Sequence, residues 1–434
     1  MRNCVIVLIL GIFLVSGCVQ QETKSGAPTP LEISDRVISE KLIVKNDSLP
    51  FDSLKISLDN RRVAYVAKEG RKWFVVVDGK EEKKYNSSIV DGTLIFSPDS
   101  KRVVYAAKEG NKMFVIVDGK EEKQYDGIGK GYPIFSPNSK HVVYAAYEEN
   151  KWFLVVDGIE EKKYDTIMES SSFFSPDSKQ TVYTATEGGK MFVVVNGKEE
   201  KRYDQVGVTP VFSPDGKRLI YGARLGNKSF MVVDGKEEKQ YDDIPIFQTP
   251  IFSPDSRRLA YIAHECNELD SALDGIEKYY CRLMVVDGKE EKKYYEFQSN
   301  AIFSPDSKRV AYAAKLGDLG GVVVVDGKEE KKFIMVSGPK FSSDSRTVAY
   351  VALNFTNFTS LKNQSIILEI AYFLVANGKE GKKYYQKDGN TYDIIMSLDQ
   401  YGREFTFDSA DSLHYLVLKE NGIYLVEEKI SDVS

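Results

Sequence analysis

Runs of apolar residues, each about five long, alternate with short polar turns along most of the chain. In one clear copy of this pattern, the stretches 103–107 and 113–117 are apolar at every position. A strand that is apolar at consecutive positions must be buried on both faces of its sheet. The stretch 121–125 is largely charged, which is typical of an edge strand. The pattern predicts four strands in this copy: 94–97, 102–108, 113–118 and 121–125, named a, b, c and d below.

The turns between these strands carry clear signals. The sequence Ser97-Pro98-Asp99-Ser100 suits a type I turn, because Pro presets φ at the second position. Asp118-Gly119 predicts a type I′ hairpin, because that turn needs positive φ at both central residues. Residues 108–111 supply a third turn. Four strands of five or six residues plus four short connections give a repeat of about 40 residues.

The chain repeats this unit eight times. A central tyrosine marks each copy, at Tyr65, Tyr105, Tyr144, Tyr183, Tyr221, Tyr261, Tyr312 and Tyr350. The first five steps are 40, 39, 39, 38 and 40 residues, a period that indicates stacked supersecondary units. A ninth, degenerate copy at 405–428 has strands a, b and c (405–407, 413–418 and 423–427), with no chain left for strand d.

Sheets with a buried middle and two distinct edges, repeated in series, are typical of the blades of a β-propeller. A two-sheet sandwich would show strict alternation along most strands. The Ser-Pro-Asp-Ser or Ser-Pro-Asp-Gly turn followed by a Tyr-centred strand resembles the TolB-like, WD-repeat-like family of propeller repeats, over residues 51–428. It departs from true WD repeats, since no copy has the Gly-His or Trp-Asp signatures.

The resemblance implies a single closed ring of four-stranded antiparallel blades, in which a strand from one terminus pairs with strands from the other. Residues 40–44 precede the first strand a and could supply the missing strand d of the ninth copy. This gives an all-β fold with nine blades, and eight blades with an irregular C-terminal appendage are the alternative.

The first 17 residues have the form of a secretory signal peptide, with Arg2 and an apolar stretch at 5–15 that is short for a membrane span. Val15-Ser16-Gly17-Cys18 resembles the lipobox of prokaryotic lipoproteins, which implies lipidation of Cys18. An ordinary signal peptide with an incidental cysteine is the alternative. Residues 18–37 are then a lipid-anchored flexible tether, and 38–430 are the propeller domain. The expected location is the outer side of a cell membrane, or a periplasm.

Two insertions enlarge the repeats, both between strands b and c. The first contains Cys266 and Cys281, which are predicted to form a disulfide in an extracytoplasmic compartment, with two unpaired thiols as the alternative. The second, at 353–369, contains three of the six Asn-x-Ser/Thr sequons. The candidate glycosylation sites are Asn354, Asn357 and Asn363, and the other sequons begin at Asn46, Asn86 and Asn227.

Loops of a meander alternate between the two faces of the array. The a–b and c–d turns share one face and are nearly uniform, so this is the turn face. The b–c and d–a loops share the other, the loop face, which has both insertions; the d–a loops include 86–93, 126–132, 166–171 and 242–248. Variable loops on a rigid scaffold tend to bind partners. The candidate contacts are on the d–a segments: Tyr132, Met168, Glu169, Phe247, Tyr295 and Phe297.

The chemistry-bearing residues give no catalytic, metal or cofactor site. The three histidines are scattered, and no nucleophile elbow or phosphate-binding loop occurs. The net charge of −5 and the mixed Lys and Glu of the d strands predict solvated outer rims and no basic face for nucleic acid. The expected function is a non-enzymatic scaffold that binds a protein or envelope component through its loop face. An enzyme with carboxylates at the channel and a cell-surface spacer are the alternatives.

Overall fold

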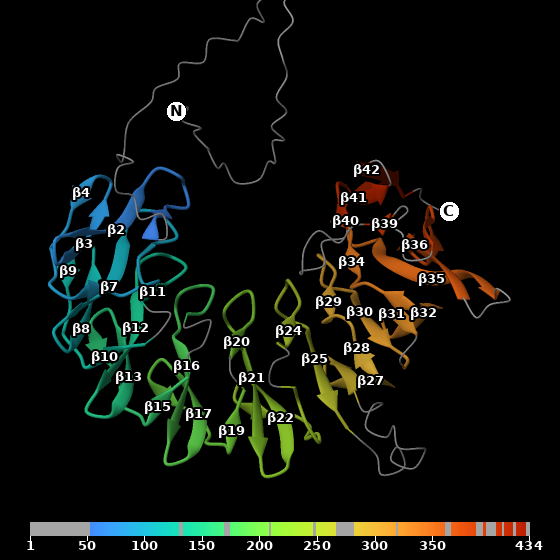
Figure 1. Cartoon of the computed structure of the whole chain (residues 1–434). Helices are drawn as coiled ribbons and strands as arrows, with labels where there is room; N and C mark the ends of the chain where they lie inside the picture. Colours follow the sequence, from blue (N-terminus) through green and yellow to red (C-terminus); the bar gives the residue numbers. More distant parts are fainter. Residues whose placement is uncertain are drawn as a thin grey trace, which may run out of the picture. The chain divides into compact units, whose positions relative to one another are not determined.

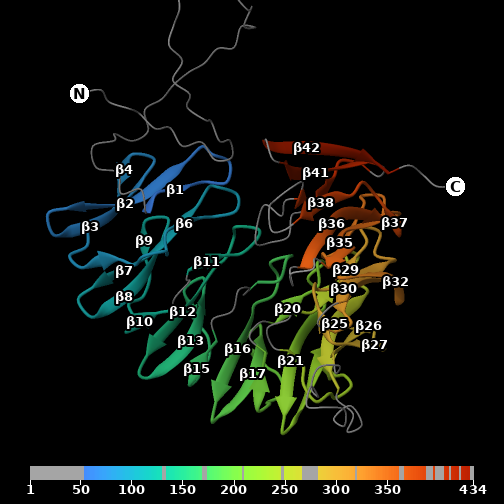
Figure 2. The ribbon, with the colours of Figure 1, turned by 45° about the vertical axis from the view of Figure 1, so that its right-hand side comes forward.

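The computed structural model describes residues 53–129, 133–168, 174–207, 210–245, 249–265, 282–317, 320–360, 366–387, 394–395, 405–409, 412–419 and 422–430. All of them belong to the compact unit Val44–Ser434. They form nine antiparallel sheets, one for each copy of the repeat. Figures 1 and 2 show that consecutive sheets lie side by side in chain order. No helix among the described residues is long and apolar enough to cross a bilayer.

The two central strands of each sheet correspond to the apolar stretches. The b strands are β2 (Val63–Glu69), β7 (Val103–Glu109), β12 (Val142–Glu148), β16 (Val182–Glu187), β21 (Leu219–Leu225), β25 (Leu259–His264), β30 (Val310–Lys315), β35 (Val348–Ser360) and β41 (Ser412–Lys419). The c strands are β3 (Lys72–Val77), β8 (Lys112–Val117), β13 (Lys151–Val156), β17 (Lys190–Val195), β22 (Lys228–Val233), β26 (Arg282–Val286), β31 (Gly321–Val325), β36 (Ile366–Ala376) and β42 (Gly422–Lys429).

Strand d is an edge, as predicted, but only its ends pair with strand c. The d strands are β4 (Lys80–Glu81), β9 (Lys120–Glu121), β14 (Ile159–Glu160), β18 (Lys198–Glu199), β23 (Lys236–Glu237), β27 (Lys289–Tyr294), β32 (Lys328–Phe333) and β37 (Lys379–Glu380). A further strand, β38 (Tyr384–Lys387), pairs with β36.

Strand a differs from the prediction, because it has two halves that both pair with strand b. The second halves are β1 (Lys55–Ile56), β6 (Ile95–Phe96), β11 (Ile134–Phe135), β20 (Val211–Phe212), β24 (Ile251–Phe252), β29 (Ile302–Phe303), β34 (Lys340–Phe341) and β40 (Phe405–Phe407). The first halves are β5 (Ser88–Ile89), β10 (Gly127–Ile128), β15 (Thr166–Ile167), β19 (Gln205–Val206), β28 (Glu296–Phe297), β33 (Met335–Val336) and β39 (Ile394–Ile395).

These first halves lie in the stretches that the sequence assigns to d–a loops, so that assignment is corrected. Each is only two residues long, and a run this short carries no periodic signal. The second half of strand b supplies the partner: Ile89 pairs with Ala107, and Ile128 with Ala146. In the second sheet, the hydroxyl of Thr93 accepts a hydrogen bond from the N–H of Ala106, between the two halves.

The turns agree with the sequence. Asp118 and Gly119 have φ values of 50° and 78°, as a type I′ hairpin requires. The N–H of Ser100 donates to the carbonyl of Ser97, closing the predicted turn, and Ser100 has a φ of 65°. The fifth copy has Gly216 at this position, where a Cβ would lie 2.9 Å from the Asp177 carboxylate. Glycine therefore allows a closer approach of these two sheets.

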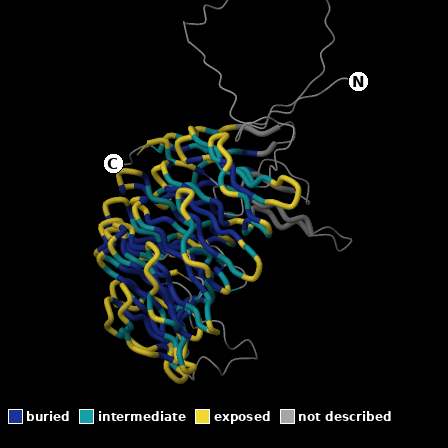
Figure 3. Tube along the Cα trace, turned by 90° about the vertical axis from the view of Figure 1, so that its left-hand side faces the viewer, coloured by how far each residue is buried: buried dark blue, intermediate teal, exposed yellow. Residues whose placement is uncertain are grey.

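The core lies between the sheets. Each apolar cluster joins the c strand and the d-strand aromatic residue of one sheet to strand b of the next, and Figure 3 shows buried positions along the sheet middles with exposed turns around them. Tyr105, Tyr144 and Tyr183 are at most 1 % exposed. Tyr65, which has the same place in the first sheet, is half-buried. We call the packing interface between two consecutive sheets a seam.

The ninth sheet contains the predicted strands a, b and c as β40, β41 and β42. No described strand lies beyond β42, and among the described strands no hydrogen-bonded pairing joins the first sheet to the ninth. Residues 40–44, the predicted closing strand, lie outside the described residues. Ring closure by this segment therefore stays a prediction, as does the number of blades in the ring.

Candidate binding faces

Each a–b turn on the turn face is held by its own side chains. The Ser97 hydroxyl donates to Asp99 Oδ1 at 2.6 Å and accepts from the N–H of Arg102. The N–H of Lys101 also donates to Asp99 Oδ1. The Ser97 hydroxyl and then the Lys101 amide lower the pKa of Asp99, because both donate to its charged form. Most copies repeat this arrangement, so the turn carboxylates serve the fold.

The same turn also contacts the next sheet. The N–H of Asp99 donates to the hydroxyl of Ser139, which belongs to the following turn, at 2.9 Å. Equivalent bonds join Asp59 to Ser100, Asn138 to Ser178, Asp215 to Ser256, Asp255 to Ser307, and Asp306 to Ser345. One serine thus closes its own turn and accepts the bond that joins it to the previous one.

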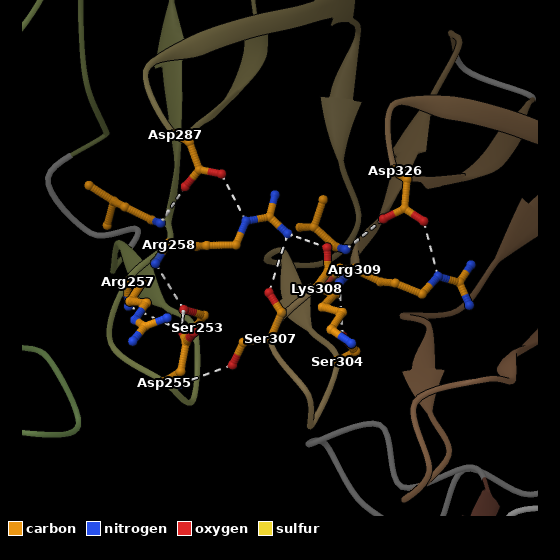
Figure 4. A network of polar contacts seen from close by, with 12 residues as sticks. Ser253, Asp255, Arg257, Arg258, Asp287, Ser304, Ser307, Lys308, Arg309 and Asp326 are labelled. Atoms are coloured by element: carbon orange, nitrogen blue, oxygen red, sulfur yellow. Dashed lines mark hydrogen bonds and ion pairs between the residues drawn. The ribbon is translucent and has the colours of Figure 1, made fainter.

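An arginine at the start of strand b bridges two sheets. In Figure 4, Arg258 Nε donates to Asp287 Oδ2 at 2.8 Å, and Asp287 Oδ1 accepts the N–H of Leu259. The other end of the guanidinium donates to the carbonyl of Lys308 in the next sheet at 2.6 Å. The guanidinium also lies 5.1 Å from the ring centroid of Phe303. Arg62, Arg102, Arg218 and Arg309 make equivalent contacts.

Three copies replace this arginine, and two of them also replace its carboxylate. His141 faces Asp157 at 2.7 Å. The fourth copy has Gln180 and Asn196, and the eighth has Thr347 and Asn377, so both charges are absent there. In both neutral pairs the asparagine Oδ1 accepts a hydrogen bond from a backbone N–H at the start of strand b, as the aspartate does in the other copies. The hydrogen bond to the backbone is therefore kept in each of the first eight copies.

Side chains of the charged d strands reach into the seams and bond to the next sheet, which their sequence does not predict. In six of the strings the second glutamate accepts a hydrogen bond from the central tyrosine of the next sheet: Glu82 accepts from the Tyr105 hydroxyl at 2.6 Å, and Glu122 from Tyr144 at 2.6 Å. Tyr85, three residues after Glu82, also packs into this seam, edge-to-face against Phe114. Residues three apart normally lie on opposite faces of a strand.

A β-bulge explains this arrangement. In the sixth sheet the register shifts between Leu283 and Val285, so that β27 contains one extra residue. The extra residue turns both the glutamate and the tyrosine toward the same seam. The prediction of merely solvated outer rims is corrected here, because Tyr85, Tyr125 and Tyr164 are at most 1 % exposed and the second glutamates bond buried tyrosines.

The first glutamates form a series of ion pairs along the outer edge. A lysine of each d strand pairs with the first glutamate of the next d strand, at 2.5 to 2.7 Å in six of the seven cases. The seven rim pairs are Lys83–Glu121, Lys123–Glu160, Lys162–Glu199, Lys201–Glu237, Lys239–Glu290, Lys292–Glu329 and Lys331–Glu380.

We expect the rim pairs to make the fold sensitive to acid. The paired lysine lowers the pKa of Glu121, Glu237 and Glu290 below the ordinary value of 4.5. A carboxyl whose pKa is lower in the folded chain stabilises the fold above 4.5, and this contribution is lost as the pH falls through the folded value. Burial raises the pKa of Glu161 and acts in the opposite sense.

The measurement is the urea midpoint of unfolding between about pH 7 and pH 3. We expect little change down to about pH 5 and a steep fall below about pH 4.5, because six lowered carboxyls outweigh one raised carboxyl. A midpoint that rises on acidification would contradict this prediction.

The loop face has the predicted candidate contacts, of which only three lie among the described residues. Tyr132, Glu169 and Phe247 lie outside them. Met168 and Tyr295 are half-buried, after β15 and before β28. Phe297 is buried in the seam, edge-to-face against Tyr294 and Tyr312, so its side chain belongs to the core. Met168 and Tyr295 are therefore the described candidates that keep some exposed surface, and their role stays a prediction.

The second insertion forms a long hairpin at the loop face. Strands β35 and β36 span 13 and 11 residues, against six or seven for β7 and β8, and a bulge interrupts their pairing between Phe355 and Asn357. Asn354 and Asn357 lie on β35, whereas Asn363 lies outside the described residues, as do Cys266 and Cys281. Glycosylation and the disulfide stay predictions.

Shallow grooves open along the seams at the turn face. One, of about 720 Å³, lies between the first and second sheets and is lined by Asp78, Glu82, Lys83, Arg102 and Asp118, among others. A groove of about 670 Å³ lies at the equivalent place between the fourth and fifth sheets. Their linings mix both charges. Among the described residues no group of three or more His, Cys, Asp or Glu could hold a metal ion.

No family profile and no curated protein matches the chain. Several solved structures are similar to it. The chain is similar to TolB from Acinetobacter baumannii, at 18 % identity over 62 % of each chain, with a TM-score of 0.24. A β-propeller domain of Swd1 from Myceliophteria thermophila is similar at 13 % identity, over 69 % of this chain and 93 % of that one, with a TM-score of 0.23.

A crystal structure of a eukaryotic initiation factor is similar at 12 % identity, over 77 % of this chain and 90 % of that one, with a TM-score of 0.37. The chain is thus similar to TolB and WD-repeat propellers, as its repeats predict. The antiparallel sheets of the chain itself establish the all-β repeat architecture.

Proposed function

We propose that this chain is an extracytoplasmic, lipid-anchored β-propeller that acts as a non-enzymatic scaffold and binds a protein or envelope component through its loop face. The tether at 18–37 connects the propeller to the membrane through Cys18. Met168, Tyr295 and the β35–β36 hairpin are the described parts of the binding surface. The signal-peptide form of the first 17 residues and the resemblance of residues 15–18 to a lipobox support the location.

The β35–β36 hairpin is the observation that carries this proposal. On the turn face, one set of side chains recurs from sheet to sheet and bonds the neighbouring sheets together, so its polar groups serve the fold. On the loop face, β35 and β36 extend well beyond the length that a sheet of this array needs. An extension that the core does not require is available for a partner. No specific observation favours an enzyme or a spacer.

The test is an affinity pull-down from native membranes with a trimmed hairpin. Removing residues 358–368 and joining Asn357 to Glu369 through an Asn-Gly turn keeps the Asn357–Glu369 pair and the pairing of β36 with β38. We expect the trimmed chain to fold with an unchanged thermal midpoint and to lose its partner. Equal recovery of partners by both chains would refute this binding surface and favour the spacer.

The anchor is tested separately in the same cells. A Cys18→Ala chain is expected to move from the membrane fraction to the soluble fraction, because the acyl chains are absent. A Cys18→Ala chain that stays in the membrane fraction would contradict the lipid anchor while leaving the binding surface untouched.

A further inference from the structure

The turn face has far more positive charge than the composition of the chain indicates. Five positions in each copy form it: the third, fifth and sixth residues from the serine that opens the a–b turn, and the Asp and Lys of the c–d turn. In the second copy these are Asp99, Lys101, Arg102, Asp118 and Lys120. Over the first eight sheets these 40 positions have 20 Lys or Arg and 13 Asp, in a chain whose net charge is −5.

The carboxylates of the turn face accept hydrogen bonds from neighbouring groups of the protein. Asp99 accepts hydrogen bonds from its own turn, and Asp287 accepts one bond on each oxygen, from the Leu259 amide and the Arg258 guanidinium. The side chains of Asp99 and Asp287 are 41 % and 40 % exposed, respectively. Their negative charge is held close to the backbone of the turns.

Two sets of cations extend into solvent instead. Side chains of the a–b turns are 79 to 87 % exposed and contact their own turn aspartates at only 3.4 to 4.0 Å; the set comprises Lys101, Lys179, Lys217, Lys308 and Arg346. The lysines of the c–d turns are exposed and have no ion pair within the described part of the chain; the set comprises Lys80, Lys120, Lys198, Lys236, Lys289, Lys328 and Lys379.

At these five positions, the excess of positive over negative charges is nearly constant from sheet to sheet. Where the fourth and eighth copies lose the arginine of strand b, they lose its carboxylate as well, so each still has one positive charge in excess. Only the third sheet, with His141 and Ile159, has none. The mixed composition, from which no basic face for nucleic acid is predicted, averages a turn face with a positive excess and a negative remainder.

We propose that the turn face docks on the headgroups of an anionic lipid bilayer. This inference rests on the proposed lipid anchor, which would keep the propeller near a membrane surface. The cations are separate point charges on flexible stems at repeated positions, and the grooves between them are lined by both charges. Such an array suits many separate headgroups better than one ligand in a cleft. The loop face would then point away from the bilayer.

The test is co-sedimentation with vesicles of the mature chain from residue 18 with Cys18→Ser, so that no acyl chain contributes. Vesicles contain either phosphatidylcholine alone or phosphatidylcholine with about a third phosphatidylglycerol. The turn-face variant combines Lys101→Gln, Lys179→Gln, Lys217→Gln and Lys308→Gln. The matched control removes the same charge from the loop face, with Lys112→Gln, Lys151→Gln, Lys190→Gln and Lys228→Gln. Thermal melts check that both variants fold.

We expect salt-sensitive binding to the anionic vesicles only. Since each lysine near an anionic surface contributes roughly a fivefold gain in partitioning, removing four should weaken binding by the turn-face variant roughly 600-fold, and binding by the control much less. Equal losses in both variants, no loss in either, or equal binding to both vesicle types would overturn the proposal. Binding to soluble polyphosphate or DNA without binding to vesicles would also overturn it. None of these outcomes depends on the hairpin pull-down.

Discussion

Replacing Tyr144 by alanine is expected to lower the free energy of unfolding by about 3 to 5 kcal/mol, as for other large buried aromatics. Tyr144 has no exposed surface, contacts Tyr125 edge-to-face, and donates to Glu122 at 2.6 Å. Alanine leaves a cavity in the seam between the second and third sheets and removes the hydrogen-bond donor of Glu122. Urea unfolding followed by tryptophan fluorescence, to which Trp73 and Trp152 both contribute, measures the loss.

Two further variants separate packing from hydrogen bonding. Tyr144→Phe keeps the ring and leaves Glu122 without its donor, so we expect a loss of about 1 to 3 kcal/mol. Tyr65→Ala removes the equivalent tyrosine of the first sheet, which is half-buried, and should cost less than half as much as Tyr144→Ala. Similar losses at Tyr65 and Tyr144 would mean that burial in a seam does not determine the effect.

Replacing Arg258 by glutamine is expected to lower the free energy of unfolding by about 1 to 2 kcal/mol. The change removes the contact with Asp287 and the bond to the Lys308 carbonyl in the next sheet. The two side chains are 27 % and 40 % exposed, so solvent screening keeps the loss at the lower end of the range for charged hydrogen bonds.

Adding Asp287→Asn to Arg258→Gln recreates the Gln180–Asn196 pair of the fourth sheet. We expect the double variant to be more stable than Arg258→Gln, because the uncompensated carboxylate is gone and the asparagine still accepts the Leu259 amide. Urea unfolding followed by circular dichroism, on both single variants and the double variant, gives the coupling energy. Additive losses would show that the two positions act independently.

Much of the sheet architecture could be predicted, because strong local signals mark it. The apolar stretches at 103–107 and 113–117 and the Asp118-Gly119 turn specify the central strands and their hairpins. The two-residue strands such as β5 and β10 could not be predicted, since they pair only because strand b extends beyond β6 and β11. The bulge in strand d was equally hidden, because no Gly or Pro marks it.

The side-chain contacts of the turn face leave a signal in the sequence that the hydrophobic periodicity does not include. Arg102 and Asp118 are separated by 16 residues, and the joint change to Gln180 and Asn196 in the fourth copy shows within one chain that the two positions are coupled. The charge of the turn face could likewise be counted only after each position had been assigned to a face. The candidate contacts Tyr132, Glu169 and Phe247 were predicted only because they lie in loops. The sequence of a loop does not by itself determine whether such a side chain is exposed or buried.

Each sheet has two different sides: one contributes the d-strand lysine and second glutamate, and the other contributes the central tyrosine and first glutamate. The interface is heterologous, so the same kind of contact can repeat from one copy to the next along the array. Gain or loss of one whole copy therefore keeps this pairing of unlike sides, whereas loss of half a copy removes one side of a seam. The array can change its number of units in single steps, and sequence length can otherwise grow within the loops of the loop face, as it does in the two b–c insertions.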